Sequence, residues 1–281
     1  MAACGVFRGA SHQLRGPLPQ VPSGKVLLLW PCSARGCLSR RSRSFATLSH
    51  LEFDAGGAQE KKTALVMHGI LGNKVNMRTF SKNLAARNPS WRFILLDHRG
   101  HGGSPSPDPP HTVEACAADA VATLSSLQPR PAVRLVIGHS FGGKVALEVA
   151  RQLHARGGLD APLHAWVLDS VPGLVPEDQA RPESVSSVIA HVGDVPMPVR
   201  SKEHLLEELG KRGISKTLAN WMTTNLQSDA ASGGYVWKFD VQLIDALFRA
   251  YKRADYMPFL SSLPARICVR LVMASRSQGS T

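Results

Sequence analysis

Short apolar runs alternate with amphipathic stretches along most of this chain. Five runs rich in apolar and β-branched residues have the length of buried strands: 63–67, 91–96, 133–137, 163–168 and 267–273. Three stretches between them have the composition and apolar spacing of helices: 76–87, 112–127 and 144–153. Strands that alternate with helices predict an α/β fold, with a mostly parallel sheet flanked by helices and right-handed crossovers. A site is then expected at the carboxyl ends of the strands.

Two of these stretches show which face of the helix is apolar. In 76–87, Phe80 and Leu84 are four residues apart and share one face of an amphipathic helix. In 112–127, Thr112 is a suitable N-cap. The apolar face that follows it consists of Ala117, Val121 and Leu124. We expect both apolar faces to pack inward.

The strand rhythm stops between about 173 and 258, where helical spacing replaces it. Apolar residues recur at i, i+4, i+7 and i+8 from Ile214, and 241–253 is a further helical stretch. We interpret 173–258 as a mostly helical insertion that forms a lid. Four residues are candidates for the walls of an acyl pocket, and each is equally consistent with the core of the lid: Trp221, Met222, Trp237 and Phe239.

The run 133–137 leads into Gly138-His139-Ser140-Phe141-Gly142, and a helical stretch follows. A G-x-S-x-G motif between a strand and a helix is typical of a nucleophile elbow, which holds the serine Oγ at the tip of a strained turn near the positive end of a helix. Glycine is required there because a Cβ at Gly138 or Gly142 would collide with the neighbouring strand and helix. Ser140 is therefore the candidate nucleophile, and a structural serine in a tight turn is the alternative.

A glycine-flanked loop, His68-Gly69-Ile70-Leu71-Gly72, directly follows the run 63–67. Acyl transfer needs backbone N–H donors for the developing oxyanion, one commonly from such a loop and one from the residue after the nucleophile. We assign these donors to Ile70 or Leu71, and to Phe141. His68 is expected to hydrogen-bond loop backbone and not to act as the catalytic base.

A third motif makes a family resemblance specific: Asp97-His98-Arg99-Gly100-His101-Gly102-Gly103-Ser104 follows the run 91–96. The His-Gly loop, this D-x-R-G-x-G-x-S motif and G-x-S-x-G, in that order, resemble the α/β-hydrolase superfamily over about 61–273. The resemblance implies the α/β-hydrolase fold and a serine hydrolase of carboxylic esters or thioesters, with no metal or organic cofactor. The serine argues against the branches that use aspartate as the nucleophile.

The resemblance also implies an acid and then a histidine after the nucleophile. The usual position of the acid is empty, because no Asp or Glu follows Asp255. The turn Asp169-Ser170-Val171-Pro172 resembles the acid turn of a subgroup of mitochondrial and bacterial esterases. Asp169 is therefore the candidate acid, with a turn-capping role as the alternative. Together with 220–226, this turn resembles the mitochondrial α/β hydrolase domain-containing protein 11 group.

The triad histidine has no candidate at the expected position, since the final histidine is His204, inside the predicted lid. Matched against the family, the chain is expected to lack the last helix, the last strand and the histidine loop, so 46–281 is interpreted as a C-terminally incomplete hydrolase domain. His191 or His204 could serve as the base only after a rearrangement of the lid. The alternative function is a non-catalytic or inactive α/β-hydrolase-like chain that binds an acyl ligand or a protein partner.

The positive charge is concentrated at the beginning of the chain. The 281 residues have a net charge of +12, and residues 1–50 contain seven Arg and Lys residues and no acid. This segment is also rich in Ser, Pro and Gly, which is typical of organelle transit peptides, and 43–46 resembles a mitochondrial cleavage site. We expect a mitochondrial transit peptide over 1–45, with a chloroplast peptide or a disordered basic tail as alternatives. The rest is only mildly basic, so nucleic-acid binding is not expected.

No apolar run approaches the roughly 20 residues that span a bilayer, so no transmembrane segment is expected. Beyond residue 45 the chain has two cysteines, Cys116 and Cys268, too few for a disulfide framework or a metal cage. Both are expected to be buried free thiols. A small acyl ester or thioester is the expected partner, and the sequence identifies no protein partner.

Overall fold

The computed structural model describes residues 47–54, 56, 61–157, 159–176 and 183–273. The chain divides into two compact units, Met1–Ser42 and Arg43–Thr281. Every described residue belongs to the second unit. The transit peptide expected over 1–45 therefore lies outside the described residues. Among the helices that the structure describes, none is long and apolar enough to cross a membrane.

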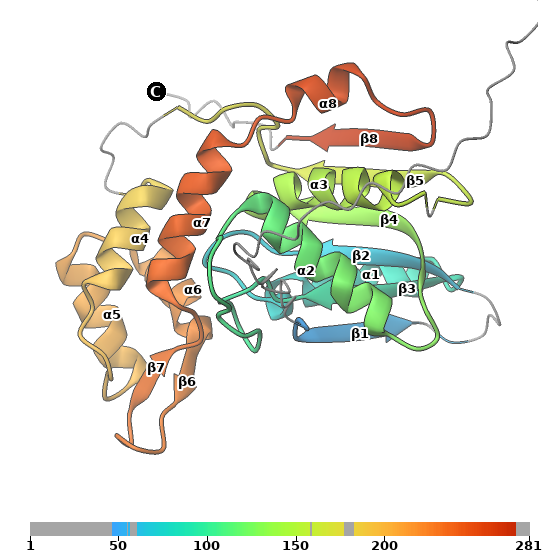
Figure 1. Cartoon of the computed structure of the whole chain (residues 1–281). Helices are drawn as coiled ribbons and strands as arrows, with labels where there is room; N and C mark the ends of the chain where they lie inside the picture. Colours follow the sequence, from blue (N-terminus) through green and yellow to red (C-terminus); the bar gives the residue numbers. More distant parts are fainter. Residues whose placement is uncertain (1–46, 55, 57–60, 158, 177–182, 274–281) are drawn as a thin grey trace, which may run out of the picture. The chain divides into compact units, whose positions relative to one another are not determined.

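One mixed sheet forms the centre of the described unit (Figure 1). Its six strands lie in the order β1-β3-β2-β4-β5-β8. Neighbouring strands are parallel except for the antiparallel pair β1 and β3. The strands span His50–Asp54 (β1), Lys62–Met67 (β2), Trp91–Leu96 (β3), Ala132–His139 (β4), Leu163–Leu168 (β5) and Ile267–Val272 (β8). The predicted α/β fold with a mostly parallel sheet is confirmed.

Strand β1 was not predicted. Its apolar side chains, Leu51 and Phe53, pack against the same cluster as one face of β2 and β3. Two apolar residues in a five-residue strand give an alternation too short to distinguish from a loop. The strand pairs with β3 over its full length at the edge of the sheet.

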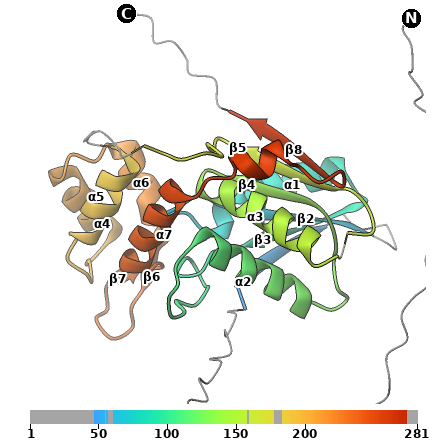
Figure 2. The same cartoon turned by 45° about the horizontal axis from the view of Figure 1, so that its top comes forward.

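Helices cover both faces of the sheet (Figure 2). Helices α2 (Val113–Ser126) and α3 (Phe141–Ala155) share one hydrophobic core with the strand residues that point toward them. Helix α1 (Arg78–Arg87) follows the 3₁₀-helix η1 (Lys74–Met77) and packs on the opposite face. The predicted inner face of α2 is confirmed, because its three apolar residues are buried: Ala117, Val121 and Leu124.

The predicted apolar face of α1 is only partly buried, because Leu84 packs against the core and Phe80 does not. Phe80 is 36% exposed, whereas Ser81 and Ala85 are buried. The small side chains of Ser81 and Ala85 allow the helix to approach the sheet closely. Leu84 is half-buried and lines a hollow of about 260 Å³ beside the helix.

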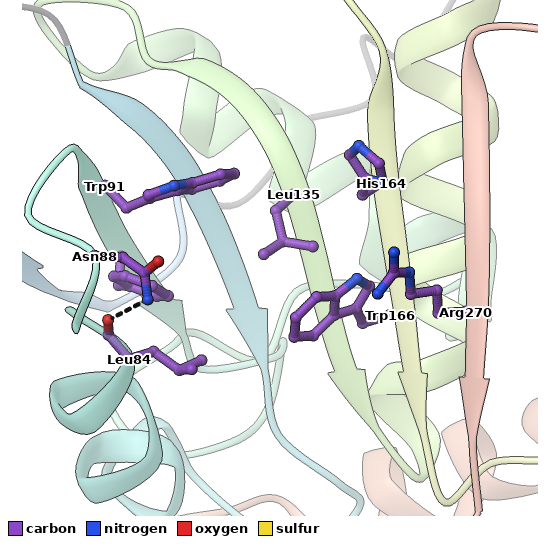
Figure 3. Close-up of a pocket in the computed structure, with 8 residues that line it drawn as sticks. Leu84, Asn88, Trp91, Leu135, His164, Trp166 and Arg270 are labelled. Atoms are coloured by element: carbon purple, nitrogen blue, oxygen red, sulfur yellow. Dashed lines mark hydrogen bonds between the residues drawn. The ribbon is translucent and has the colours of Figure 1, made fainter.

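This hollow lies on the α1 face of the sheet (Figure 3). Trp91 borders one side, Trp166 and Arg270 border the other, and Leu135 lies between them. Leu135 precedes Ser140 by five residues on β4, which corresponds to roughly 16 Å along an extended strand. The hollow is therefore separate from the carboxyl edge of the sheet, where Ser140 lies.

An insertion of helices and one hairpin separates β5 from β8. Its elements are α4 (Val185–Gly193), α5 (Lys202–Lys211), α6 (Lys216–Met222), the 3₁₀-helix η2 (Thr223–Asn225), β6 (Leu226–Ser228), β7 (Tyr235–Trp237), α7 (Val241–Arg253) and α8 (Met257–Ser261). The β6–β7 hairpin was not predicted, because each strand has only three residues. The insertion is mostly helical, as expected, and its function as a lid stays a prediction.

The four aromatic and Met candidates for an acyl pocket belong to the packed core of the insertion. Met222 is fully buried and Phe239 is 8% exposed. Trp237 stacks on Phe239, with ring centroids 4.9 Å apart, and Trp221 is partly buried against the same core. These contacts favour the core alternative for all four.

The two cysteines differ in burial. Cys116 lies on the inner side of α2, and burial raises the pKa of its thiol. Cys268 is exposed, contrary to expectation, because β8 is the outer strand of the sheet and only alternate residues of it face the core. The burial of Cys268 was therefore wrongly predicted.

A buried ion pair fixes the connection between β3 and α2. The Arg99 guanidinium donates to the Asp119 carboxylate at 2.7 Å, and the two side chains are 6% and 0% exposed. Arg99 also donates to the carbonyl oxygens of Pro110 at 2.7 Å and Ala115 at 3.3 Å. The arginine of the D-x-R-G motif thus joins the loop after β3 to the beginning of α2.

Replacing Arg99 by Met is expected to lower the free energy of unfolding by about 3–5 kcal/mol, because a buried carboxylate loses its cationic partner. The matched control is Arg249→Met, which removes a surface pair with Asp245 whose side chains are 58% and 42% exposed. That control should cost about 0.5 kcal/mol or less. Urea unfolding of both variants measures the difference, and equal losses would contradict the role given to Arg99.

Candidate active site

Ser140 occupies the sharp turn between β4 and α3, in the left-handed region of the backbone with φ 50° and ψ −118°. The two glycines around it, Gly138 and Gly142, are required because there is no room for a side chain. A Cβ at Gly138 would overlap the Gly142 carbonyl oxygen, and a Cβ at Gly142 would lie 2.5 Å from the His68 carbonyl oxygen. The Ser140 N–H donates to the Leu168 carbonyl oxygen at 2.8 Å. The turn therefore has the geometry expected of a nucleophile elbow, and its half-buried serine lies at the carboxyl edge of the sheet.

Backbone strain gathers at this edge. Within the part of the chain that the structure describes, the non-glycine residues with positive φ are Leu71 at 59°, Ser140 at 50° and Asp169 at 49°. They follow β2, β4 and β5, which are neighbours in the sheet. A residue in such a conformation costs about 1–3 kcal/mol, and it persists where the surroundings impose it, commonly at functional sites. All three are residues that the sequence assigned to the site.

The loop 68–73, called the β2 loop below, lies directly against the elbow. A Cβ at Gly69 would lie 3.3 Å from the Ser140 Cβ. The Gly72 N–H donates to the Gly69 carbonyl oxygen at 3.1 Å, which closes the loop into a turn. The N–H groups assigned to the oxyanion have no hydrogen-bond acceptor among the described residues: those of Ile70, Leu71 and Phe141. Unpaired donors are thus present in the β2 loop, which lies against Ser140, and at the residue after Ser140.

Asp169 follows β5 at the same edge. His139 pairs with Leu168 in the register of β4 and β5, so Ser140 and Asp169 end adjacent parallel strands at the same level. The Asp169 N–H donates to the Val272 carbonyl oxygen at 2.7 Å, and the residue is exposed. The structure thus brings Ser140 and Asp169 to neighbouring strand ends, and it leaves the carboxylate accessible to another group.

Within the described ranges, no histidine nitrogen is hydrogen-bonded to the Ser140 hydroxyl. His204 lies on α5, where its Nδ1 accepts the Arg200 N–H at 3.3 Å. His191 lies in the last turn of α4. Neither histidine is brought to the serine by these contacts.

Buried histidines lie beneath the β2 loop. The Nδ1 of His68 donates to the Gly69 carbonyl oxygen at 2.7 Å, because its Nε2 accepts the His98 N–H at 3.1 Å. The Nε2 of His98 donates in turn to the His68 carbonyl oxygen at 3.0 Å. His68 therefore binds backbone groups with both nitrogens, as expected of a residue that is not the base.

His101 completes this histidine cluster of His68, His98 and His101, with its ring centroid 5.1 Å from that of His68. Burial lowers the pKa of His68 and His98 well below the usual value. Burial also lowers the pKa of His101, to about 4. All three imidazoles are neutral at pH 7 for this reason. Despite their proximity, no group of three or more His, Cys, Asp or Glu side chains in the described residues could hold a metal ion.

A lysine in the elbow helix fastens the insertion to the sheet unit. The Lys144 Nζ donates to the carbonyl oxygens of Gly173, Tyr251 and Ala254, each at 2.7 Å. Gly173 is the first residue of the insertion and the other two lie at the end of α7, so one ammonium binds the start of the insertion and a part near its end. Burial lowers the pKa of Lys144 to about 8. Sequence reasoning missed this residue, although the apolar residues on all sides of the stretch that follows it indicate a buried helix.

Comparisons with known proteins agree with this fold. A family model described as "Alpha/beta hydrolase family" matches residues 64–278. The chain is 28% identical over 217 residues to sn-1-specific diacylglycerol lipase ABHD11 of Danio rerio, covering 74% of this chain and 62% of that protein. It is 28% identical over 184 residues to the protein of the same name from Xenopus laevis, covering 64% and 54%. The chain thus spans less than two thirds of the length of these relatives.

Solved structures with the same fold are more distant in sequence. One described as "Marine microorganism esterase" has a TM-score of 0.63 at 18% identity, with coverage of 82% of this chain and 92% of that one. An E-2-(acetamidomethylene)succinate hydrolase has a TM-score of 0.56 at 17% identity, with coverage of 82% and 88%. Likeness at this identity shows the shared fold.

The histidine cluster predicts a fold that acid destabilises. Each imidazole is neutral in the folded chain and protonates near pH 6.5 once unfolded, so the unfolded chain binds more protons below about that pH. The free energy of unfolding should be at its full value above about pH 6.5 and should fall toward about pH 4, by up to ~1.4 kcal/mol per pH unit for each histidine. Urea unfolding across this range measures the slope.

His101→Gln tests the contribution of the cluster. It should reduce this slope by the contribution of about one proton, up to ~1.4 kcal/mol per pH unit. Leu124→Ala is the control, because it weakens the core without removing a titrating group. An unchanged slope in His101→Gln would show that the acid sensitivity arises elsewhere.

Proposed function

Since the chain belongs to the alpha/beta hydrolase family, we propose that it is a serine hydrolase in which Ser140 attacks a carboxylic ester or thioester. The observation that carries this proposal is the positive φ shared by Leu71, Ser140 and Asp169. One is in the β2 loop, one in the elbow and one in the turn after β5, and the strands before them are neighbours. Nothing in local sequence propensity favours this conformation at a Leu, and strain of this kind is typical of sites held ready for chemistry.

The proposed reaction begins when the Ser140 Oγ adds to the acyl carbon and loses its proton to a base. The negative charge that develops on the carbonyl oxygen is stabilised by the Phe141 N–H and by the N–H of Ile70 or Leu71. Collapse of the tetrahedral intermediate breaks the bond to the alcohol or thiol, which leaves with a proton. Water then repeats the addition on the acyl-serine, releases the carboxylic acid and restores Ser140.

Asp169 has a positioning role in this proposal. A triad carboxylate fixes the tautomer and orientation of a histidine and stabilises the imidazolium that forms. The base that fits is a histidine outside the described residues, placed between Asp169 and Ser140. Two observations support such a placement: Asp169 is exposed, and it follows β5 at the same level of the sheet as Ser140 follows β4.

The relatives indicate a substrate class. The chain matches two proteins named sn-1-specific diacylglycerol lipase over 62% and 54% of their lengths. We extend the proposal to acylglycerol esters on this basis. The Arg-rich residues 1–45, with no acidic side chain, support import into mitochondria, with the chloroplast as the alternative destination.

A second candidate function is a non-catalytic chain of the same fold that binds an acyl ligand or a protein partner. The observation that favours it is that no histidine within the described ranges is hydrogen-bonded to Ser140. Loss of a triad histidine can lower kcat by roughly 10⁶, while oxyanion donors and binding can leave about 10³ to 10⁴ over water. The two candidates therefore differ in whether turnover depends on Ser140.

Ser140→Ala is expected to lower turnover of a short-chain p-nitrophenyl ester by roughly 100-fold or more, because the nucleophile is lost. The assay is run with and without added imidazole, which can enter the space beside the exposed Asp169 and act as the base. The control variant is Ser125→Ala, which removes an exposed serine hydroxyl bonded to the Val121 carbonyl oxygen.

Circular dichroism establishes that each variant is folded. The proposal requires that turnover, or its increase with imidazole, disappears in Ser140→Ala and persists in Ser125→Ala. If the parent and Ser140→Ala are folded and equally inert under both conditions, the serine-hydrolase function is excluded for this chain and the non-catalytic candidate stands.

A further inference from the structure

Asn225 connects the insertion to the β2 loop through its side-chain amide. Its Nδ2 donates to the Leu71 carbonyl oxygen at 2.8 Å. Its Oδ1 accepts the Asn73 Nδ2 at 2.8 Å. Asn225 is 1% exposed and Asn73 is 5% exposed, so both amides are shielded from water. More than 150 residues of chain separate Asn225 from each of these partners.

Backbone groups determine the orientation of both amides. The Asn73 Oδ1 accepts the Val75 N–H at 2.9 Å, so the Nδ2 of Asn73 is the group that faces Asn225. The Asn225 Oδ1 must then accept, and its Nδ2 must donate to Leu71. The direction of donation along the chain of amides has no second solution.

These bonds hold the peptide unit between Leu71 and Gly72. The carbonyl oxygen of the Leu71–Gly72 peptide is held by Asn225, and its N–H is held by the Gly69 carbonyl oxygen at 3.1 Å. The peptide on the carboxyl side of Leu71, a residue with a φ of 59°, is thus fixed at both ends. This peptide belongs to the loop that lies against Ser140 and whose Ile70 and Leu71 N–H groups have no acceptor among the described residues.

The insertion in turn fixes Asn225. It is the last residue of η2, and its carbonyl oxygen accepts the Lys238 N–H at 2.7 Å, across the base of the β6–β7 hairpin. The position of the amide therefore depends on how the insertion is folded and placed.

We propose that Asn225 is a positioning residue, through which the insertion holds the oxyanion donors of the β2 loop in place. This inference rests on the proposed function for its consequence in catalysis, but the coupling between Asn225 and the loop is a physical property that exists without turnover. It makes the insertion part of the machinery of the site.

Asn225→Leu tests the proposal with a side chain of similar shape and no polar atoms. Amide hydrogen exchange at Gly72, whose N–H is bonded to the Gly69 carbonyl oxygen, is expected to become about tenfold faster or more, because the Leu71–Gly72 peptide loses its other anchor, while exchange in β2 and β4 stays the same. For an active parent, kcat should fall by about 10- to 100-fold, less than for deletion of an oxyanion donor, with KM changed by about threefold or less.

Asn225→Asp is the second variant, and it keeps the native shape if Asn225→Leu does not fold. A carboxylate cannot donate to the Leu71 carbonyl oxygen, whereas a protonated carboxyl can. The ratio of its kcat to that of the parent, and the protection of the Gly72 amide relative to the parent, should both rise as the pH is lowered from about 8 to about 6, because burial raises carboxyl pKa values. The control is Thr224→Ala, an exposed neighbour whose hydroxyl bonds only the Trp221 carbonyl oxygen.

Two results would overturn the proposal, and they are separable from failure of the proposed function. Unchanged exchange at Gly72 in a folded Asn225 variant overturns it, whether or not the parent turns over ester. A loss of kcat that Thr224→Ala reproduces also overturns it. If the parent is inert and equal to Ser140→Ala, the hydrolase function fails, and the exchange result still decides whether Asn225 positions the loop.

Discussion

The structure depends most on the close contact between the start of helix α3 and the ends of β2 and β4. Gly138 and Gly142 have no room for a Cβ, because carbonyl oxygens of the turn and of the β2 loop occupy that space. Ser140 must therefore take a positive φ to pass from strand to helix. The same contact places the β2 loop against Ser140 and leaves the first N–H of the helix, that of Phe141, without an acceptor among the described residues. One steric constraint thus produces both the strained turn that holds Ser140, the proposed nucleophile, and an unpaired donor directly after it.

The insertion is built into this arrangement at three separate points. Asn225 bonds the Leu71 carbonyl oxygen in the β2 loop. The Asp240 N–H, at the cap of α7, donates to the Gly100 carbonyl oxygen at 2.9 Å. Lys144 in the elbow helix holds the far end of α7. Each contact uses a backbone carbonyl, so the geometry of the site and the placement of the insertion are physically linked. Substitutions in the insertion can therefore act on the site without touching a substrate.

The sequence was sufficient for the features that depend on local pattern. The parallel strands, helix α2 and the strand-turn-helix at Ser140 follow from apolar periodicity and glycine spacing. Features set by packing were missed or wrong. Phe80 is exposed because Ser81 and Ala85 make the contact with the sheet, and Lys144 is buried because it caps distant carbonyl groups. The contact of Asn225 joins residues more than 150 positions apart, and spacing along the chain carries no signal for it.

The most direct test of the central claim is addition of Ser140 to a trigonal centre beside the unpaired N–H donors. Phenylboronic acid reports this addition, because its boron becomes tetrahedral when a serine Oγ binds it, and boron NMR distinguishes the two states. We expect a tetrahedral signal with the parent chain that is absent from folded Ser140→Ala. Identical spectra from the two folded proteins would contradict the claim that the elbow presents Ser140 as a nucleophile.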